Sequence, residues 1–351
     1  MSFAATDVVR RTVPGFLLAA LLALISTVLA DSVFAHRVSP VLCAVLLGML
    51  WRNTVGIPRW SAEGLNWTMQ RVLRTGIALI GLRLTLAGAG IIAATAVPVV
   101  VVCIMAALVA GIGISKLMGV PRRLGTLLAV GTAVCGCTAV VALSPVIRAR
   151  NVETAYAVTC VVLFGCVGML FYPWLAAVLF GESPVHAGVF LGTSIHDTSQ
   201  VVGSALIYSQ QHGAPEALSA ASVTKMLRNL SIAILIPAAA WLMRGTEEQA
   251  DGETAPPARA VPFFVIAFVG FVFLRTLGDS VFGGDSWRAI LAASQSGAEL
   301  LLVCGMAAVG LNVPFAQMWR IGWRPLASGM VIAVLVGACS LLATLAMRRF
   351  F

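Results

Sequence analysis

The chain of 351 residues is too apolar for a soluble protein. Sixty per cent of its residues are hydrophobic and 11% are charged, and the mean hydropathy is +0.97. A soluble domain carries roughly 25% charged residues, so this composition excludes a soluble enzyme. The 23 Lys and Arg residues exceed the 14 Asp and Glu residues and give a net charge of +9. In such an apolar chain we assign this excess to cytoplasmic loops and expect no nucleic-acid partner.

Apolar stretches recur along the chain, and a crossing helix needs about 20 apolar residues. The sequence predicts an all-α, polytopic protein with a cytoplasmic N-terminus at 1–12, one transmembrane transporter domain at 13–347 and a tail at 348–351. We expect about nine full spans, at 13–30, 38–51, 70–86, 90–115, 153–180, 216–243, 261–277, 298–313 and 325–347. The first span is long for a signal peptide.

Two further apolar stretches, 124–147 and 187–208, are interrupted near their middles by Gly, Thr and Ser. A plain crossing by 124–147 would place Arg148 and Arg150 outside, against the rule that basic loops stay inside. The pattern favours two broken or re-entrant elements, although a broken helix that crosses would violate the rule at only these two residues. The segment 245–260, with four acids and two prolines, is expected to be a cytoplasmic linker.

Two pairs of segments resemble each other. GTAVCGCTAVVA begins at Gly131 and GTSIHDTSQVVG begins at Gly192, an offset of 192 − 131 = 61 residues. GIALIGLRL begins at Gly76 and GMAAVGLNV begins at Gly305, an offset of 305 − 76 = 229 residues. In the predicted topology the members of each pair have opposite orientations. Inverted repeats with broken helices that meet near the midplane are typical of secondary transporters.

The interrupted stretches carry the candidate site, because polar groups at membrane depth are functional candidates by default. One stretch supplies polar side chains around a His-Asp pair, and its companion supplies a tip of small residues. The candidates for substrate binding are Thr193, Ser194, His196, Thr198, Ser199 and Gln200 in the first stretch, and Thr132, Cys135, Gly136 and Thr138 in the second. Free amides at the starts of helices favour an anion here. His196 or Asp197 would couple protons, unless the two only satisfy each other and the broken backbone.

Lys225 and Arg228 lie on one helix face inside an apolar span, with Asn229 beside them, and we add all three to the binding residues. Two cations in lipid are costly, so they are expected to face the protein interior. They either compensate Asp197 and attract an oxyanion, or form a structural ion pair or snorkel. The sequence leaves these interpretations open.

The segments GTAVCGCTAVVALSP, GTSIHDTSQVVGSA and VTKMLRN, in this order, resemble the YeiH-type sulfate exporter family of bacterial inner-membrane proteins. The resemblance extends from about Pro14 to Met347. The first tip departs from the family pattern after its Cys-Gly pair, which leaves the substrate preference open. The resemblance implies a polytopic transporter in the bacterial cell inner membrane that exports sulfate or sulfite.

We therefore expect an alternating-access secondary transporter for a small anion of the sulfate or sulfite class, coupled to protons. The alternatives are a sodium-coupled transporter of an organic anion or sulfonate and a passive anion channel. A membrane-embedded enzyme is a weaker alternative. We expect no catalytic residue, no metal and no cofactor, and no ATP-binding motif is present. The expected surroundings are the lipid bilayer and, left open, a second copy in a homodimer.

Overall fold

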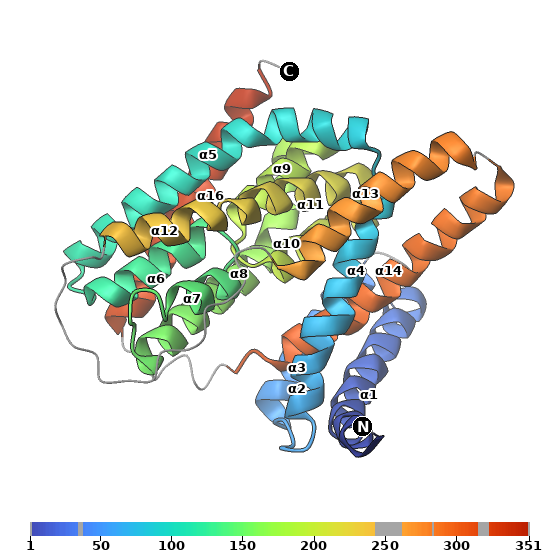
Figure 1. Ribbon diagram of the computed structural model, residues 1–351, viewed down its shortest axis with the longest axis horizontal. Coiled ribbons are helices and arrows are strands. Elements are labelled where there is room, and N and C mark those ends of the chain that lie inside the picture. The colour runs from blue at the N-terminus through green and yellow to red at the C-terminus, as the bar shows by residue number, and fades with distance from the viewer. Residues whose placement is uncertain (1, 34–37, 243–261, 283, 315–322, 350–351) are drawn as a thin grey trace. The chain divides into compact units, whose positions relative to one another are not determined.

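The computed structural model describes residues 2–33, 38–242, 262–282, 284–314 and 323–349 (Figure 1). All regular elements in these ranges are helical, as the composition predicts. The helices are α1 (Ser2–Ser32), α2 (Pro40–Thr54), α3 (Ala62–Trp67), the π-helical turn η1 (Thr68–Val72), α4 (Leu73–Leu79), the 3-10 turn η2 (Ile80–Arg83), α5 (Leu86–Leu117), α6 (Arg122–Ala133), α7 (Cys137–Leu143), α8 (Asn151–Phe180), α9 (Pro184–Ser194), α10 (Thr198–His212), α11 (Pro215–Leu230), α12 (Ile232–Leu242), α13 (Phe263–Val281), α14 (Asp285–Leu311) and α16 (Trp323–Met347).

Six helices of the described chain are long and apolar enough to cross a membrane: Arg10–Ser32, Leu86–Leu117, Asn151–Phe180, Phe263–Val281, Asp285–Leu311 and Trp323–Met347. They correspond to six of the nine predicted spans. The other three differ from single long helices, so the number nine stays a prediction. The expected cytoplasmic linker at 245–260 lies outside the described residues.

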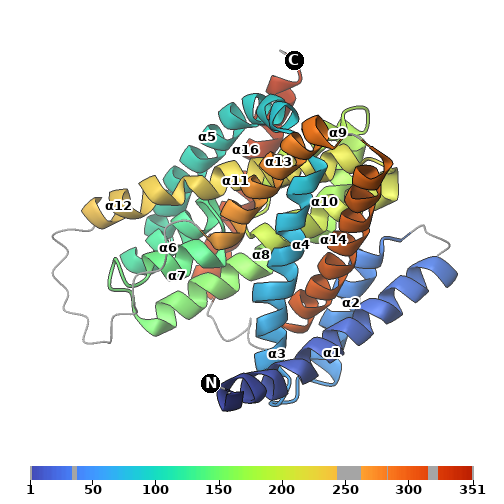
Figure 2. The same cartoon turned by 45° about the vertical axis from the view of Figure 1, so that its right-hand side comes forward.

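The three differing spans have local causes. Helix α2, at the predicted span 38–51, has only 15 residues. The predicted span 70–86 is a succession of π, α and 3-10 turns rather than one α-helix. The predicted span 216–243 is divided at Ser231 into α11 and α12, because the Ser231 hydroxyl donates to the Arg228 carbonyl at 2.6 Å and competes with the helical bond. Figure 2 shows α12 continuing from the end of α11.

The chain divides into two compact units. Unit 1 comprises the described residues of 1–89, 206–215 and 264–316, and its helices approach closely at glycines. A Cβ added to Gly310 of α14 would lie 3.1 Å from the Cα of Gly48 in α2. Small residues permit such contact between helices without any water to exclude. The half-buried ion pair between Arg83 and Glu299, at 2.5 Å, also lies in this unit.

The second pair of similar segments packs together inside unit 1. A Cβ at Gly76 would lie 3.1 Å from the Leu302 side chain, and one at Gly305 would meet the Leu73 side chain at 2.5 Å. The two contacts exchange equivalent positions, since 302 − 73 and 305 − 76 both equal 229. Residue numbers fall along one helix as they rise along the other, so these two segments run antiparallel.

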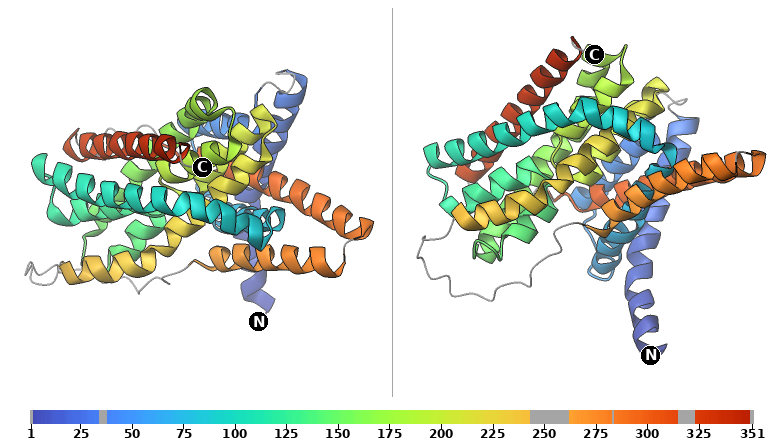
Figure 3. Two further views of the ribbon diagram at one scale, coloured as in Figure 1. Left: turned by 90° about the horizontal axis from the view of Figure 1, so that it is seen from above. Right: turned by 45° about the horizontal axis from the view of Figure 1, so that its top comes forward.

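Unit 2 comprises the described residues of 90–205, 216–263 and 317–351 and contains both interrupted stretches. Its core brings together apolar side chains from α5, α6, α7, α8, α12 and α16, such as Ile104, Leu127, Val140, Val161 and Ile332. Helix α16 lies beside α5 (Figure 3), with Ala343 and Met347 packed against the buried cluster around Val99. Unit 2 therefore holds every candidate site residue.

Candidate functional site

Two helical stretches of unit 2 are broken at matching positions of the sequence repeat. Helix α6 ends at Ala133 and α7 begins at Cys137, while α9 ends at Ser194 and α10 begins at Thr198. Both pairs of boundaries differ by 61 residues (194 − 133 and 198 − 137), which is the offset of the repeat. The predicted interruptions are therefore present, and they are equivalent. We call the two breaks, residues 134–136 and 195–197, the junction.

The two breaks of the junction touch at equivalent residues. Gly136 has φ +68°, a conformation that glycine adopts readily and other residues rarely. A Cβ at this position would lie 3.0 Å from the Cα of Asp197, and 197 − 136 is again 61. Because the backbones are this close, only one of the two equivalent positions has room for a side chain. The pair is a glycine in one break and the carboxylate of Asp197 in the other.

Lys225 of α11 contacts the ends of both broken helices. Its side chain is fully buried. The Nζ atom donates to the carbonyl oxygens of Val134 at 2.8 Å and Ile195 at 3.2 Å, and also to that of His196. Val134 and Ile195 are equivalent in the repeat, since 195 − 134 equals 61. One ammonium group thus joins matching carbonyls of the two breaks.

Arg228 does the same one turn further along α11 and is also fully buried. Its Nε atom donates to the Ala133 carbonyl at 2.6 Å and its Nη1 atom to the Thr193 carbonyl at 2.6 Å. Its Nη2 atom donates to the carbonyl of Thr132, which is the equivalent of Thr193. The last carbonyls of a helix lack intrahelical partners and carry partial negative charge, so cations are stabilised there. Lys225 and Arg228 together cap the carboxyl ends of α6 and α9.

This capping corrects the interpretation of the two cations. Within the described residues neither forms an ion pair, with Asp197 or with any other carboxylate. Their burial inside the protein was predicted correctly, but their partners are backbone carbonyls. The sequence could not indicate this, because carbonyl positions depend on where the helices break.

Asp197 caps the amino end of α10. Its Oδ1 atom accepts a hydrogen bond from the Ser199 backbone amide at 2.9 Å and another from the Ser199 hydroxyl at 2.5 Å. Aspartate is among the preferred residues at this position of a helix. The Asp197 side chain is half-buried, as are Ser199, Cys137 and Thr138. These four residues are the more accessible part of the junction.

Several buried polar atoms around the junction have no hydrogen-bond partner in the described structure. They are Ser194 Oγ, His196 Nδ1, Gln200 Oε1 and Asn229 Oδ1, and all four residues are at most 3% exposed. Buried polar atoms are nearly always hydrogen-bonded, and an exception calls for an explanation such as water or a bound ion. The cluster therefore indicates a place where a further polar species fits.

Other predicted residues hold the junction to neighbouring helices. Thr193 shares a hydrogen bond of 2.6 Å with Ser340 of α16. The Gln200 amide donates to the Val162 carbonyl of α8 at 3.0 Å. Asn229 donates to the Thr198 hydroxyl at 3.3 Å. The remaining predicted residues, Thr132 and Cys135, are buried at the junction.

Sequence reasoning missed two residues here. Cys137 begins α7 and is half-exposed, and its place one residue after Gly136 was a usable signal. Ser340 is fully buried and comes from a distant part of the chain, where nothing in the sequence distinguishes it. The structure brings all fourteen predicted site residues into unit 2, around the junction.

Comparisons with known proteins identify the family. The family described as Conserved hypothetical protein 698 matches residues 14–329. A UPF0324 membrane protein of Chlorobaculum tepidum is 31% identical over 338 residues, which cover 93% of this chain and 88% of that protein. One from Ralstonia nicotianae is 31% identical over 83% of this chain and 81% of the relative, and one from Bacillus cereus is 28% identical over 90% and 88%. The chain belongs to this family and is a multi-pass membrane protein.

Among solved structures, a sodium proton antiporter from Methanocaldococcus jannaschii aligns with 95% of this chain and 99% of its own, at 12% identity. The TM-score is 0.29, which is too low to support an argument about fold or function.

Proposed function

We propose that this member of the Conserved hypothetical protein 698 family is a secondary active transporter of a small anion such as sulfate or sulfite. The observation that carries the proposal is the surplus of buried positive charge at the junction. Lys225 and Arg228 are both 0% exposed, and Asp197 is the carboxylate that faces the same junction. Two positive charges and one negative charge leave a formal charge of +1.

A bound anion would balance this surplus. The carbonyl caps disperse the charge of the two cations through dipoles, but they do not remove it. In a low-dielectric interior an unbalanced charge is expensive, so a monoanion near the half-buried residues Thr138 and Ser199 would be stabilised. A dianion such as sulfate would be matched when Asp197 carries a proton, because the formal charge is then +2. This arithmetic links dianion binding to proton uptake at Asp197, with His196 as a second candidate for the proton.

The repeat geometry supports alternating access as the transport mode. Equivalent residues meet at the junction, and the segments around Gly76 and Gly305 pack antiparallel in unit 1. Both observations are those expected of inverted repeats, in which irregular backbone binds the substrate between repeated halves. The proposal retains a cytoplasmic N-terminus and the bacterial inner membrane, as the basic loops and the family resemblance imply.

One observation favours sodium as the coupling ion instead. The Asn229 Oδ1 atom is buried without a partner, and the Thr198 hydroxyl lies 3.3 Å from the amide nitrogen of the same side chain. Asp197 is the neighbour of Thr198 in sequence. Carboxylate, hydroxyl and amide oxygens are ligands that suit hard cations. A sodium-coupled transporter of an organic anion or sulfonate is therefore the second candidate.

The test is uptake of labelled sulfate and sulfite into proteoliposomes that contain the purified chain. Inward proton and sodium gradients are imposed separately. The informative variant is Asp197→Asn, because asparagine caps a helix about as well as aspartate and should leave the fold intact. The matched control is Asp285→Asn, at an exposed position at the start of α14.

Accumulation driven by the proton gradient, lost in Asp197→Asn and kept in Asp285→Asn, is the expected result. Accumulation that requires sodium would favour the second candidate. Equilibration without accumulation would indicate a passive channel and contradict secondary active transport. Full transport by a folded Asp197→Asn variant would refute the role of Asp197.

A further inference from the structure

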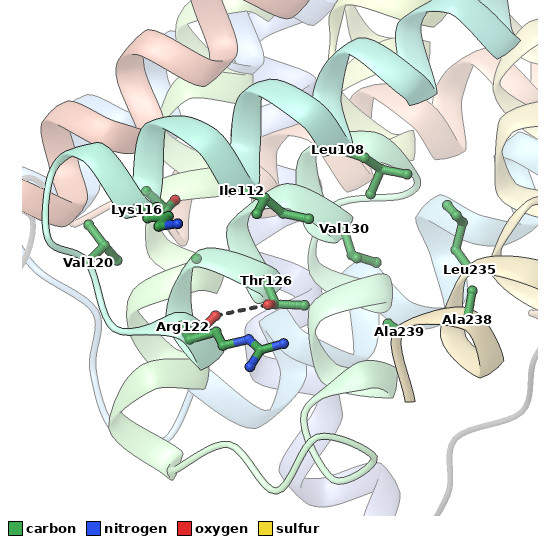
Figure 4. A pocket seen from close by; sticks show the side chains of 12 residues that line it. Leu108, Ile112, Lys116, Val120, Arg122, Thr126, Val130, Leu235, Ala238 and Ala239 are labelled. Atoms are coloured by element: carbon green, nitrogen blue, oxygen red, sulfur yellow. Dashed lines mark hydrogen bonds between the residues drawn. The ribbon is translucent and has the colours of Figure 1, made fainter. Parts of the chain in front are cut away.

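A separate cavity lies in unit 2 between α5, α6 and α12 (Figure 4). Its volume is about 770 Å³, within the range of roughly 300–1,000 Å³ typical of small-molecule sites. Its lining includes no residue of the predicted site. Most of the lining is aliphatic: Leu108, Ile112, Val120, Val130, Leu235, Ala238 and Ala239.

The cavity has one positive end. Lys116, in the last turn of α5, and Arg122, the first residue of α6, lie at the same end, and Leu235 and Ala238 of α12 lie at the other (Figure 4). Both cationic side chains belong to exposed residues.

The other polar side chains of the lining are already bonded. Ser115 shares a hydrogen bond of 3.2 Å with Ser328, and Thr126 donates to the Arg122 carbonyl at 2.9 Å. The chemistry left for an occupant is an apolar body with a negative group at one end.

We propose that this cavity binds an anionic phospholipid, with an acyl chain along the aliphatic lining and the phosphate at Lys116 and Arg122. The chain is a membrane protein, so phospholipid is always available to it. Basic pockets between transmembrane helices on the cytoplasmic side suit anionic head groups, and the basic loop at 116–123 is predicted to lie on that side. A small free anion would leave the aliphatic volume unfilled, and a neutral lipid would leave the cations without a counter-charge.

The occupant would touch elements that build the junction. Val130 lines the cavity and lies two residues before Thr132, whose carbonyl accepts from Arg228. Helix α12 follows α11, which carries Arg228, directly after Ser231. A lipid between α6 and α12 would therefore brace both sides of the Arg228 cap, and we expect it to stabilise unit 2.

Binding is measured on the purified full chain in a neutral detergent, by native mass spectrometry and by thermal shift. The probes are phosphatidylglycerol and phosphatidylcholine with identical acyl chains, and glycerol 3-phosphate without chains. Phosphatidylglycerol should bind and raise the unfolding temperature, phosphatidylcholine should bind more weakly, and glycerol 3-phosphate should have no effect at the same concentration.

Three variants locate the site. Lys116→Gln with Arg122→Gln should lower the affinity for phosphatidylglycerol, by about fivefold for each cation removed near a membrane surface. Arg59→Gln with Arg71→Gln removes two exposed cations of unit 1 and should change nothing. Ala238→Trp fills the apolar end and should weaken both lipids, with the head-group contacts intact.

The proposal is overturned if the two lipids bind equally to the unmodified chain. It is also overturned if the control pair lowers affinity as much as the Lys116 and Arg122 pair. Binding of glycerol 3-phosphate as tight as that of the lipid would refute the role of the aliphatic lining. None of these readouts depends on transport, so the lipid site and the proposed transport function fail separately.

Discussion

Replacing Arg228 by methionine tests whether the buried cation holds the two broken helices together. Methionine fills a similar volume and adds no charge. The substitution leaves the carbonyls of Thr132, Ala133 and Thr193 without their donor. Each orphaned buried acceptor costs about 1–3 kcal/mol, so three give a gross loss of roughly 3–9 kcal/mol.

The gross loss is partly offset, because the variant no longer buries a charge. Replacing a buried charge and all of its partners by apolar groups is often neutral, but here the carbonyls belong to the backbone and remain. We therefore expect a net loss of about 3 kcal/mol. At about 2 °C for each kcal/mol in a chain of this size, the unfolding temperature should fall by about 6 °C.

The assay is thermal unfolding of the purified chain in detergent, followed by reaction of its buried cysteines with a thiol dye. Cys103, Cys135 and Cys160 are all buried in unit 2, so they report on opening of that unit. Arg71→Met is the matched control, since Arg71 is exposed and lies in unit 1. Arg228→Lys should fall between the two, because one ammonium cannot reproduce the fork of the guanidinium. Equal unfolding temperatures for Arg228→Met and Arg71→Met would refute the capping role.

Three further outcomes follow from the backbone geometry. Gly136→Ala should lower the unfolding temperature and abolish transport, because φ is +68° and the Asp197 Cα lies 3.0 Å from the new Cβ; stability equal to the unmodified chain would contradict the contact. Gly113→Ala should raise stability by up to about 1 kcal/mol, since nothing lies within 4 Å of its Cβ position, and a measured destabilisation would contradict that open surface. Gly310→Ala should destabilise unit 1 because it approaches the Gly48 Cα to 3.1 Å, and hydrogen exchange of α2 and α14 should rise; unchanged exchange would show that the helices do not touch there.

Composition and local pattern were sufficient for the membrane class and for the positions of the two breaks. Runs of apolar residues predict spanning helices wherever no competing bond forms, as in α5, α8 and α16. The repeat offset of 61 residues was visible in the letters, and the helix boundaries follow it. The division at Ser231 was missed because one hydroxyl can interrupt an apolar helix without altering its hydropathy.

What only the tertiary structure decided is the set of partners at the junction. The sequence indicated that Lys225 and Arg228 face inward, because lipid excludes buried charge. It could not show that both end on carbonyls of the two breaks. Every residue type carries a backbone carbonyl, so such partners leave no mark in the sequence. The contact between Gly136 and Asp197 is equally a product of three dimensions. Residue types determine which groups must avoid lipid, and the positions at which helices end determine what those groups find instead.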